Sequence, residues 1–295
     1  MANLKDIKRQ IKSVKNTQKT TRAMKLVSTA KLRRTEELAK KSKVYAQKLT
    51  ELIDDIAYSI KKYKAGGIES RYFEEIQNPV IVDIVFVTAD KGLCGGFNAQ
   101  TIKRTQKLID YYTQKKVKVR LRGVGKKGVE YFKFNKVDMH EQIVDLSATP
   151  DYDRASDFMD SVVKSFVEGE TDKIILIHNG YVNMITQEVK EDNVLPIDPT
   201  ISEKDDENSS ALEQEPADDE QMLNTLVYKY VRYSMYYALI DSLAAEHSAR
   251  MQAMDAATNN AKDMVDKLST KYNKARQESI TTELIEIISG MEALK

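Results

Sequence analysis

A long heptad repeat near the carboxyl terminus constrains the fold of this chain more than any other feature. From Leu223, alternating steps of three and four residues lead to Ala275, and nearly every position reached is apolar or small. No glycine or proline occurs from 217 to 289. A 3.5-residue repeat sustained over this length is typical of a supercoiled helix, so we expect a long coiled-coil helix that begins near residue 220.

The amino terminus predicts a second helix of the same kind. Leu4, Ile7, Ile11 and Val14 begin an apolar stripe that resumes from Tyr45 to Tyr63, and the Ala-Gly-Gly at 65–67 ends the helix. Two heptad helices at the two ends of one chain pair most simply with each other. We therefore expect an antiparallel coiled coil formed by residues 1–65 and 220–295.

Between these two apolar stretches the first helix turns polar on its packing stripe. The same heptad phase meets Gln18, Thr21, Lys25 and Ser28. Residues 1–64 also hold 18 Lys and Arg against 6 Asp and Glu, although the whole chain has a net charge of only +1. A basic arm of this kind needs a partner of opposite sign. We interpret the polar interval as a part of the helix that touches something other than its partner helix.

The middle of the chain, 66–219, predicts a small and mostly parallel α/β domain. Buried strands are expected at 80–87, 117–122 and 173–178, and an antiparallel edge strand at 181–189, because these runs are apolar or alternate in polarity. Helices are expected at 98–114, 126–132 and 151–167. The segment 203–220 has nine acidic residues and one lysine, which predicts a mobile acidic loop.

Two glycine-rich stretches invite a nucleotide-binding interpretation. GVGKKG at 123–128 fits G-x-G-x-x-G, but it follows the second strand and not the first, and the helix after it is short. DKGLCGGFN at 90–98 lacks the G-K-[ST] ending of a phosphate loop. Tight strand-to-helix turns are the simpler interpretation of both, and we expect no cofactor. A dinucleotide-binding α/β protein stays open as an alternative.

Composition and scattered residues exclude several other classes. One cysteine, Cys94, allows no internal disulfide. No apolar stretch is long enough to span a membrane, and no secretory signal opens the chain. The histidines at 140, 178 and 247 fall in no zinc or nucleophile motif, so we expect no metal and no catalytic residue. A nucleic-acid-binding coiled coil stays open because of the basic arm, although no aromatic residue precedes Tyr45.

Three stretches together resemble one family. ANLKDIKRQIKSVKNTQKTTRAMKLVSTAKLRR at the start, DKGLCGGFN after the first strand, and AEHSARMQAMDAATNNAKDMVDKLSTKYNKARQESITTELIEIISG near the end closely resemble the gamma subunit of F-type ATP synthases. The resemblance implies a long antiparallel coiled coil of N- and C-terminal helices with an inserted Rossmann-like α/β domain that holds no nucleotide.

The same resemblance implies a function and a set of partners. The coiled coil would be the central-stalk rotor inside a ring of three alpha and three beta subunits, and the α/β foot would meet the epsilon subunit and the ring of c subunits. The rotor would carry torque between proton flow and ATP synthesis or hydrolysis without a catalytic site of its own. The complex would lie on the cytoplasmic side of a bacterial plasma membrane, with this chain peripheral to it and bound to no nucleic acid.

The resemblance and the charge pattern give candidate contact residues. Those expected to face the alpha/beta hexamer are Arg22, Met24, Lys25, Lys31, Arg33, Arg34, Arg250, Thr282 and Glu283. Those expected to shape the turn after the first strand are Asp90, Gly92, Gly95 and Gly96. Thr282 stands where the family usually has glutamine, and the single cysteine rules out the redox switch of photosynthetic members.

Overall fold

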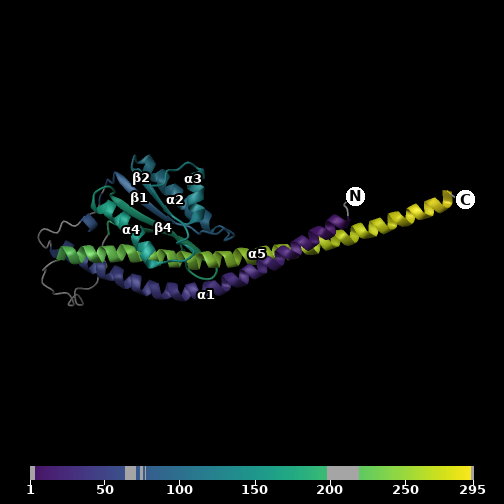
Figure 1. The fold of residues 1–295 in the computed structure, drawn as a ribbon, viewed down its shortest axis with the longest axis horizontal. Helices are drawn as coiled ribbons and strands as arrows, with labels where there is room; N and C mark the ends of the chain where they lie inside the picture. The colour runs from purple at the N-terminus through teal and green to yellow at the C-terminus, as the bar shows by residue number, and fades with distance from the viewer. Residues whose placement is uncertain (1–3, 64–70, 74–75, 77, 198–218, 294–295) are drawn as a thin grey trace. The chain divides into compact units, whose positions relative to one another are not determined.

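The computed structural model describes residues 4–63, 71–73, 76, 78–197 and 219–293. The chain divides into two compact units, Met1–Ala30 with Arg250–Lys295, and Lys31–Ala249. The predicted acidic loop at 203–220 lies outside the described residues except for its last two positions. Two long helices run through both units: α1 spans Leu4–Tyr63 and α5 spans Asp219–Ala293 (Figure 1).

A five-stranded sheet forms the centre of the larger unit. The strands are β1 (Ile81–Val87), β2 (Lys118–Val124), β3 (Glu141–Ile143), β4 (Lys173–Tyr181) and β5 (Gln187–Leu195). Their order is β3-β2-β1-β4-β5; the first four strands run parallel, and β5 pairs antiparallel with β4. The α/β fold class is therefore confirmed.

Helices cover both faces of this sheet, as a buried parallel sheet requires. On one face, Val82, Ile84 and Phe86 of β1 pack against α2 (Phe97–Gln114) and α3 (Lys126–Phe134). On the other face, Val85 and Val87 pack against α4 (Tyr152–Val167) and the first part of α5. A short 3₁₀ helix, Arg71–Phe73, adds Tyr72 to that second cluster.

The edge of the sheet departs from the sequence prediction. The antiparallel edge strand is confirmed as β5, but its expected bounds of 181–189 are wrong, because residues 182–186 form the turn between β4 and β5. Asn183 makes this turn, since its side-chain oxygen accepts hydrogen bonds from the backbone N–H groups of Ile185 and Thr186. The short strand β3 was not expected at all, because 141–145 looked irregular in sequence.

The terminal helices pair with each other in each unit. In the smaller unit, Thr21 contacts Thr258 and Lys25 contacts Asp255. In the larger unit, the ring centroids of Tyr45 and Tyr233 are 4.3 Å apart. Within the smaller unit, rising numbers on α1 meet falling numbers on α5, so the two helices run antiparallel there, as the heptad pattern predicted. Among the described residues, no helix is long and apolar enough to cross a membrane.

Candidate partner-contact surface

The polar interval of α1 faces α5, and the sequence interpretation of it was wrong. The hydroxyl oxygens of Thr21 and Thr258 are 2.7 Å apart, and Lys25 Nζ lies 2.6 Å from Asp255 Oδ1. Ser28, next on the stripe, is buried. The contact between α1 and α5, here called the seam, therefore continues through these positions with polar pairs in place of apolar ones. The carboxylate of Asp255 balances the charge of Lys25.

The outward face of this part of α1 carries apolar side chains that sequence reasoning missed. Leu26 and Val27 are 64% and 56% exposed, whereas Thr21 and Ser28 on the inner side are half-buried or buried. An amphipathic helix normally shows the reverse arrangement. The sequence contained the information for this prediction, because Leu26 and Val27 lie outside the heptad stripe of Gln18, Thr21, Lys25 and Ser28. The two exposed aliphatic side chains form a small apolar surface on this face of α1.

The predicted contact residues do not share one environment. Arg22 is exposed and Met24 is half-buried in the smaller unit, and Lys31, Arg33 and Arg34 are exposed in the larger one. Arg250 is buried, with only 8% of its surface accessible, so it does not belong to an exposed face of α5. Among the predicted contact residues, the exposed cations therefore all lie on α1.

The last turns of α5 form a second exposed apolar region. In the smaller unit α5 continues past the beginning of α1 (Figure 1), and every residue from 280 to 291 is exposed. Thr282 and Glu283 lie here; Thr282 Oγ1 donates a hydrogen bond to the carbonyl of Glu278, and Glu283 accepts one from Ser279. Their neighbours are large aliphatic side chains, namely Ile280, Leu284, Ile285, Ile287, Ile288 and Met291.

Asp90 organises the turn after β1. Its carboxylate accepts hydrogen bonds from the backbone N–H groups of Lys126, Asp145 and Ala148 and from the Ser147 hydroxyl. One buried side chain therefore joins the ends of three segments. Its neighbours complete the turn. Gly95 has φ 58°, a conformation that favours glycine. Gly92 and Gly96 do not need glycine for space, since an added Cβ at either would meet only ordinary contacts.

The GVGKKG stretch is filled by protein and leaves no cradle for a pyrophosphate. A pyrophosphate would use the backbone N–H groups at the start of α3. Those of Lys126, Lys127 and Gly128 instead donate to Asp90, the carbonyl of Ala89 and the hydroxyl of Thr88. An added Cβ on Gly128 would lie 2.4 Å from the Phe86 ring. These glycines allow α3 to pack closely on β1.

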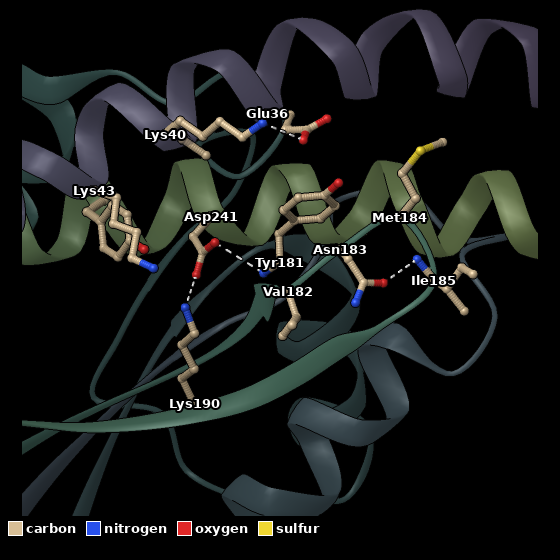
Figure 2. Close-up of a pocket in the computed structure, with 12 residues that line it drawn as sticks. Glu36, Lys40, Lys43, Tyr181, Val182, Asn183, Met184, Ile185, Lys190 and Asp241 are labelled. Atoms are coloured by element: carbon tan, nitrogen blue, oxygen red, sulfur yellow. Dashed lines mark hydrogen bonds and ion pairs between the residues drawn. The ribbon is translucent and has the colours of Figure 1, made fainter.

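One cavity in the larger unit contains charged residues. This cavity has a volume of about 740 Å³ and lies between α1, the β4–β5 turn and α5 (Figure 2). Asp241 of α5 accepts hydrogen bonds from Lys190 Nζ and from the backbone N–H of Tyr181, and its Oδ2 lies 3.2 Å from His178 Nε2. These contacts hold α5 against the hairpin. Lys40 and Glu36, one turn apart on α1, form an ion pair on the wall of the cavity.

The charges around Asp241 control its protonation. Burial alone would raise the pKa of Asp241, but the contacts with His178 and with the ammonium of Lys190 outweigh it, so the pKa is lowered. Burial would likewise lower the pKa of Lys190, and its bond to Asp241 raises it instead. Both groups therefore stay charged at neutral pH. Among the described residues, no group of three His, Cys, Asp or Glu could hold a metal ion.

Comparison with known proteins identifies close relatives over the whole chain. A family model described as ATP synthase matches residues 3–294. The ATP synthase gamma chain of Sulfurovum sp. (strain NBC37-1) is 64% identical, and that of Helicobacter pylori (strain G27) is 56% identical, each with full coverage of both chains. In fold, the chain is similar to one in the Euglena gracilis mitochondrial ATP synthase structure of OSCP, F1 and c-ring, with a TM-score of 0.66, 18% identity, and coverage of 99% of this chain and 94% of that one.

Proposed function

The chain belongs to the ATP synthase family as a gamma chain of the central stalk, and from this premise we propose that it carries torque between proton flow through the c-ring and the catalytic sites. The observation that supports this most is the direct pairing of α1 with α5 in both units. Two paired helices resist bending and twisting better than either helix alone, which is what a rotating element needs.

We propose a division of the chain into a shaft and a foot. The shaft is residues 1–65 and 220–295, and the foot is residues 66–219 with the acidic segment 203–220. Three alpha and three beta subunits surround the shaft, and the epsilon subunit and the c-ring meet the foot. The exposed aliphatic side chains of 280–291 support the first part of this assignment, because such a surface on one chain marks an interaction site.

The contact with the hexamer must be made and broken as the rotor turns. Exposed side chains such as Arg22, Arg33 and Arg34 suit this task, because ion pairs in water are worth only about 0–1 kcal/mol each and exchange easily. Lys31, Met24, Thr282 and Glu283 belong to the same proposed surface. Lys25 contributes from the contact between the two helices, where it pairs with Asp255, and Arg250 contributes from a buried position on α5.

The chain makes and breaks no covalent bond in this proposal. Catalysis occurs on the surrounding subunits, and this subunit contributes only the timing of their conformational changes. The occupied N–H groups at the start of α3 support the absence of a nucleotide site here. The complex lies on the cytoplasmic side of a bacterial plasma membrane, and this chain is attached to the membrane only through the complex.

Native mass spectrometry of the purified complex tests the assignment. One copy of this chain with three alpha and three beta subunits is the expected composition. A dinucleotide-binding enzyme or a nucleic-acid-binding coiled coil would give neither this ratio nor this set of partners. Isolation of the chain as a homodimer, with no alpha or beta subunit, would overturn the proposal.

A further inference from the structure

The amino-terminal edge of the sheet carries a cluster of lysines that torque transmission does not use. The helices α2 and α3 both end at this edge, next to the start of β2. Lys118 N–H donates to the carbonyl of Val80, which places these two residues side by side in front of β1 and β2. Val117 and Val137, just after the two helices, pack on one apolar cluster. The two helix ends are therefore neighbours on one edge of the larger unit.

Both helices end in the same motif, and in both the residue that normally would be glycine is lysine. Val117 N–H bonds to the carbonyl of Tyr112, and Val137 N–H bonds to that of Phe132. This is the pattern of a Schellman cap, in which the residue before the valine adopts positive φ. Lys116 has φ 59° and Lys136 has φ 57°. A lysine is strained in this conformation, whereas glycine is not.

Five exposed lysines define this surface, which we call the lysine edge: Lys115, Lys116, Lys118, Lys133 and Lys136. The carboxylates near them are Asp110, Glu130, Asp138 and Asp172. Glu130 pairs with Lys127 and Asp172 pairs with Arg71, so positive charge prevails among the rest. Apolar and aromatic side chains stand among the lysines. Phe134 is 87% exposed and Val80 is 69% exposed. The ammonium of Lys115 lies over the ring of Tyr111, 4.3 Å from its centroid.

The chemistry of the lysine edge fits a lipid surface better than a protein partner. Protein interfaces are enriched in arginine and depleted in lysine, and the five cations that define this edge are all lysines. Lysine acts as a mobile point charge, which suits fluid phosphate headgroups without fixed geometry. Clustered lysines with a protruding aromatic residue are the usual combination for binding an anionic membrane surface.

We propose that the lysine edge binds anionic phospholipid headgroups, with Phe134 entering the interface between headgroups and acyl chains. The contact is electrostatic and fluid, so it holds the foot near the membrane without fixing its rotational position. This proposal goes beyond torque transmission and does not depend on the identity of the residues that face the hexamer.

Cosedimentation of the assembled F1 complex with vesicles tests this inference. Vesicles of phosphatidylcholine with and without phosphatidylglycerol are compared, with no c-ring present. The variant Lys116→Gly/Lys136→Gly removes two charges and places glycine where the backbone favours it, so the fold is kept or stabilised. The matched control is Lys126→Gln/Lys127→Gln, at the start of α3 and thus at the opposite edge of the sheet. Phe134→Ser tests the apolar contribution separately.

The expected result is binding only to vesicles that contain phosphatidylglycerol, weakened about thirtyfold in the glycine variant and unchanged in the control. High salt should abolish it, because exposed charges are screened. Equal binding by the glycine variant and the native complex would overturn the proposal. So would binding of a soluble polyglutamate peptide that depends on the same two lysines while vesicles stay unbound, which would indicate an acidic protein partner instead.

Discussion

Lys25 on α1 and Asp255 on α5 form an ion pair of 2.6 Å across the seam of the terminal helices. Thr21 and Thr258 form a hydrogen bond one turn away. The seam is therefore polar where the heptad pattern suggests an interruption, and each polar group of these two pairs finds its partner on the opposite helix. A polar pair at a coiled-coil seam fixes register at some expense of stability.

A double-mutant cycle on this pair measures how strongly it couples the helices. Both side chains are partly exposed, so Lys25→Ala and Asp255→Ala should each lower the free energy of unfolding by about 0.5 kcal/mol. The double variant should lose scarcely more than either single variant, because the second substitution has no interaction left to remove. Urea titration of the full chain gives these values. Simple additivity would show that the two residues do not interact in solution.

The buried carboxylate of Asp83 should matter far more. Arg120 and Arg122 both bond to it, and Arg122 also reaches Glu141 and Ser161. Asp83 and Arg122 are almost completely buried. Asp83→Ala leaves two guanidinium groups without their central partner and should reduce stability by about 3–5 kcal/mol.

Glu170 provides a matched control for this prediction. It bonds to the same Arg120, but its side chain is 55% exposed. Glu170→Ala should therefore change the free energy of unfolding by less than about 1 kcal/mol. Urea titration measures the loss of unfolding free energy in each variant. Similar losses in the two variants would show that burial does not determine how much the Asp83 network contributes to stability.

Asp241 should make stability sensitive to acid. Its pKa in the folded chain is lowered from 3.8, so the contact stabilises the fold fully above that value. The contribution is lost as the pH falls through 3.8 toward the lower folded pKa, because the unfolded chain takes up the proton first. Thermal unfolding as a function of pH should show a steeper acid loss in the native chain than in Asp241→Asn. Parallel curves for the two chains would contradict this assignment.

The exposed arginines of α1 should affect coupling and not folding. Arg33→Glu/Arg34→Glu reverses two charges on an exposed surface, so the melting temperature of the free chain should hardly change. In the assembled synthase, ATP-driven proton pumping per ATP hydrolysed should fall by roughly fivefold to thirtyfold, since two exposed contacts of about 0.5–1 kcal/mol each are lost. Lys41→Glu/Lys48→Glu, the same charge change further along α1, is the control and should pump normally.

Sequence periodicity was sufficient for the long elements. The heptads predicted α1 and α5 because an apolar stripe and the absence of glycine and proline are local properties. The continuous apolar runs predicted β1 and β4 for the same reason. The turn at 182–186 was missed because Val182, Met184 and Ile185 imitate a strand, while the Asn183 side chain supplies the bonds that make it a turn.

The polar contacts could not be predicted, because their partners lie far away in sequence. Asp83 looks like an exception within an apolar strand until Arg120 and Arg122 are placed beside it by the register of β1 and β2. Asp90 looks like a loop residue until the ends of β3 and β2 reach its carboxylate. The direction in which Thr21 and Lys25 point depends likewise on Asp255 and Thr258.

Rotation of a synthase whose two terminal helices are covalently joined tests the central claim most directly. In Thr21→Cys/Thr258→Cys, oxidation should form a disulfide across the seam where the two hydroxyl groups now touch. A bead attached to the foot reports ATP-driven rotation by light microscopy. We expect the oxidised and reduced enzymes to rotate at the same rate, because α1 and α5 turn together as one element. Arrest on oxidation, with recovery on reduction, would show that the helices move against each other and would contradict the account.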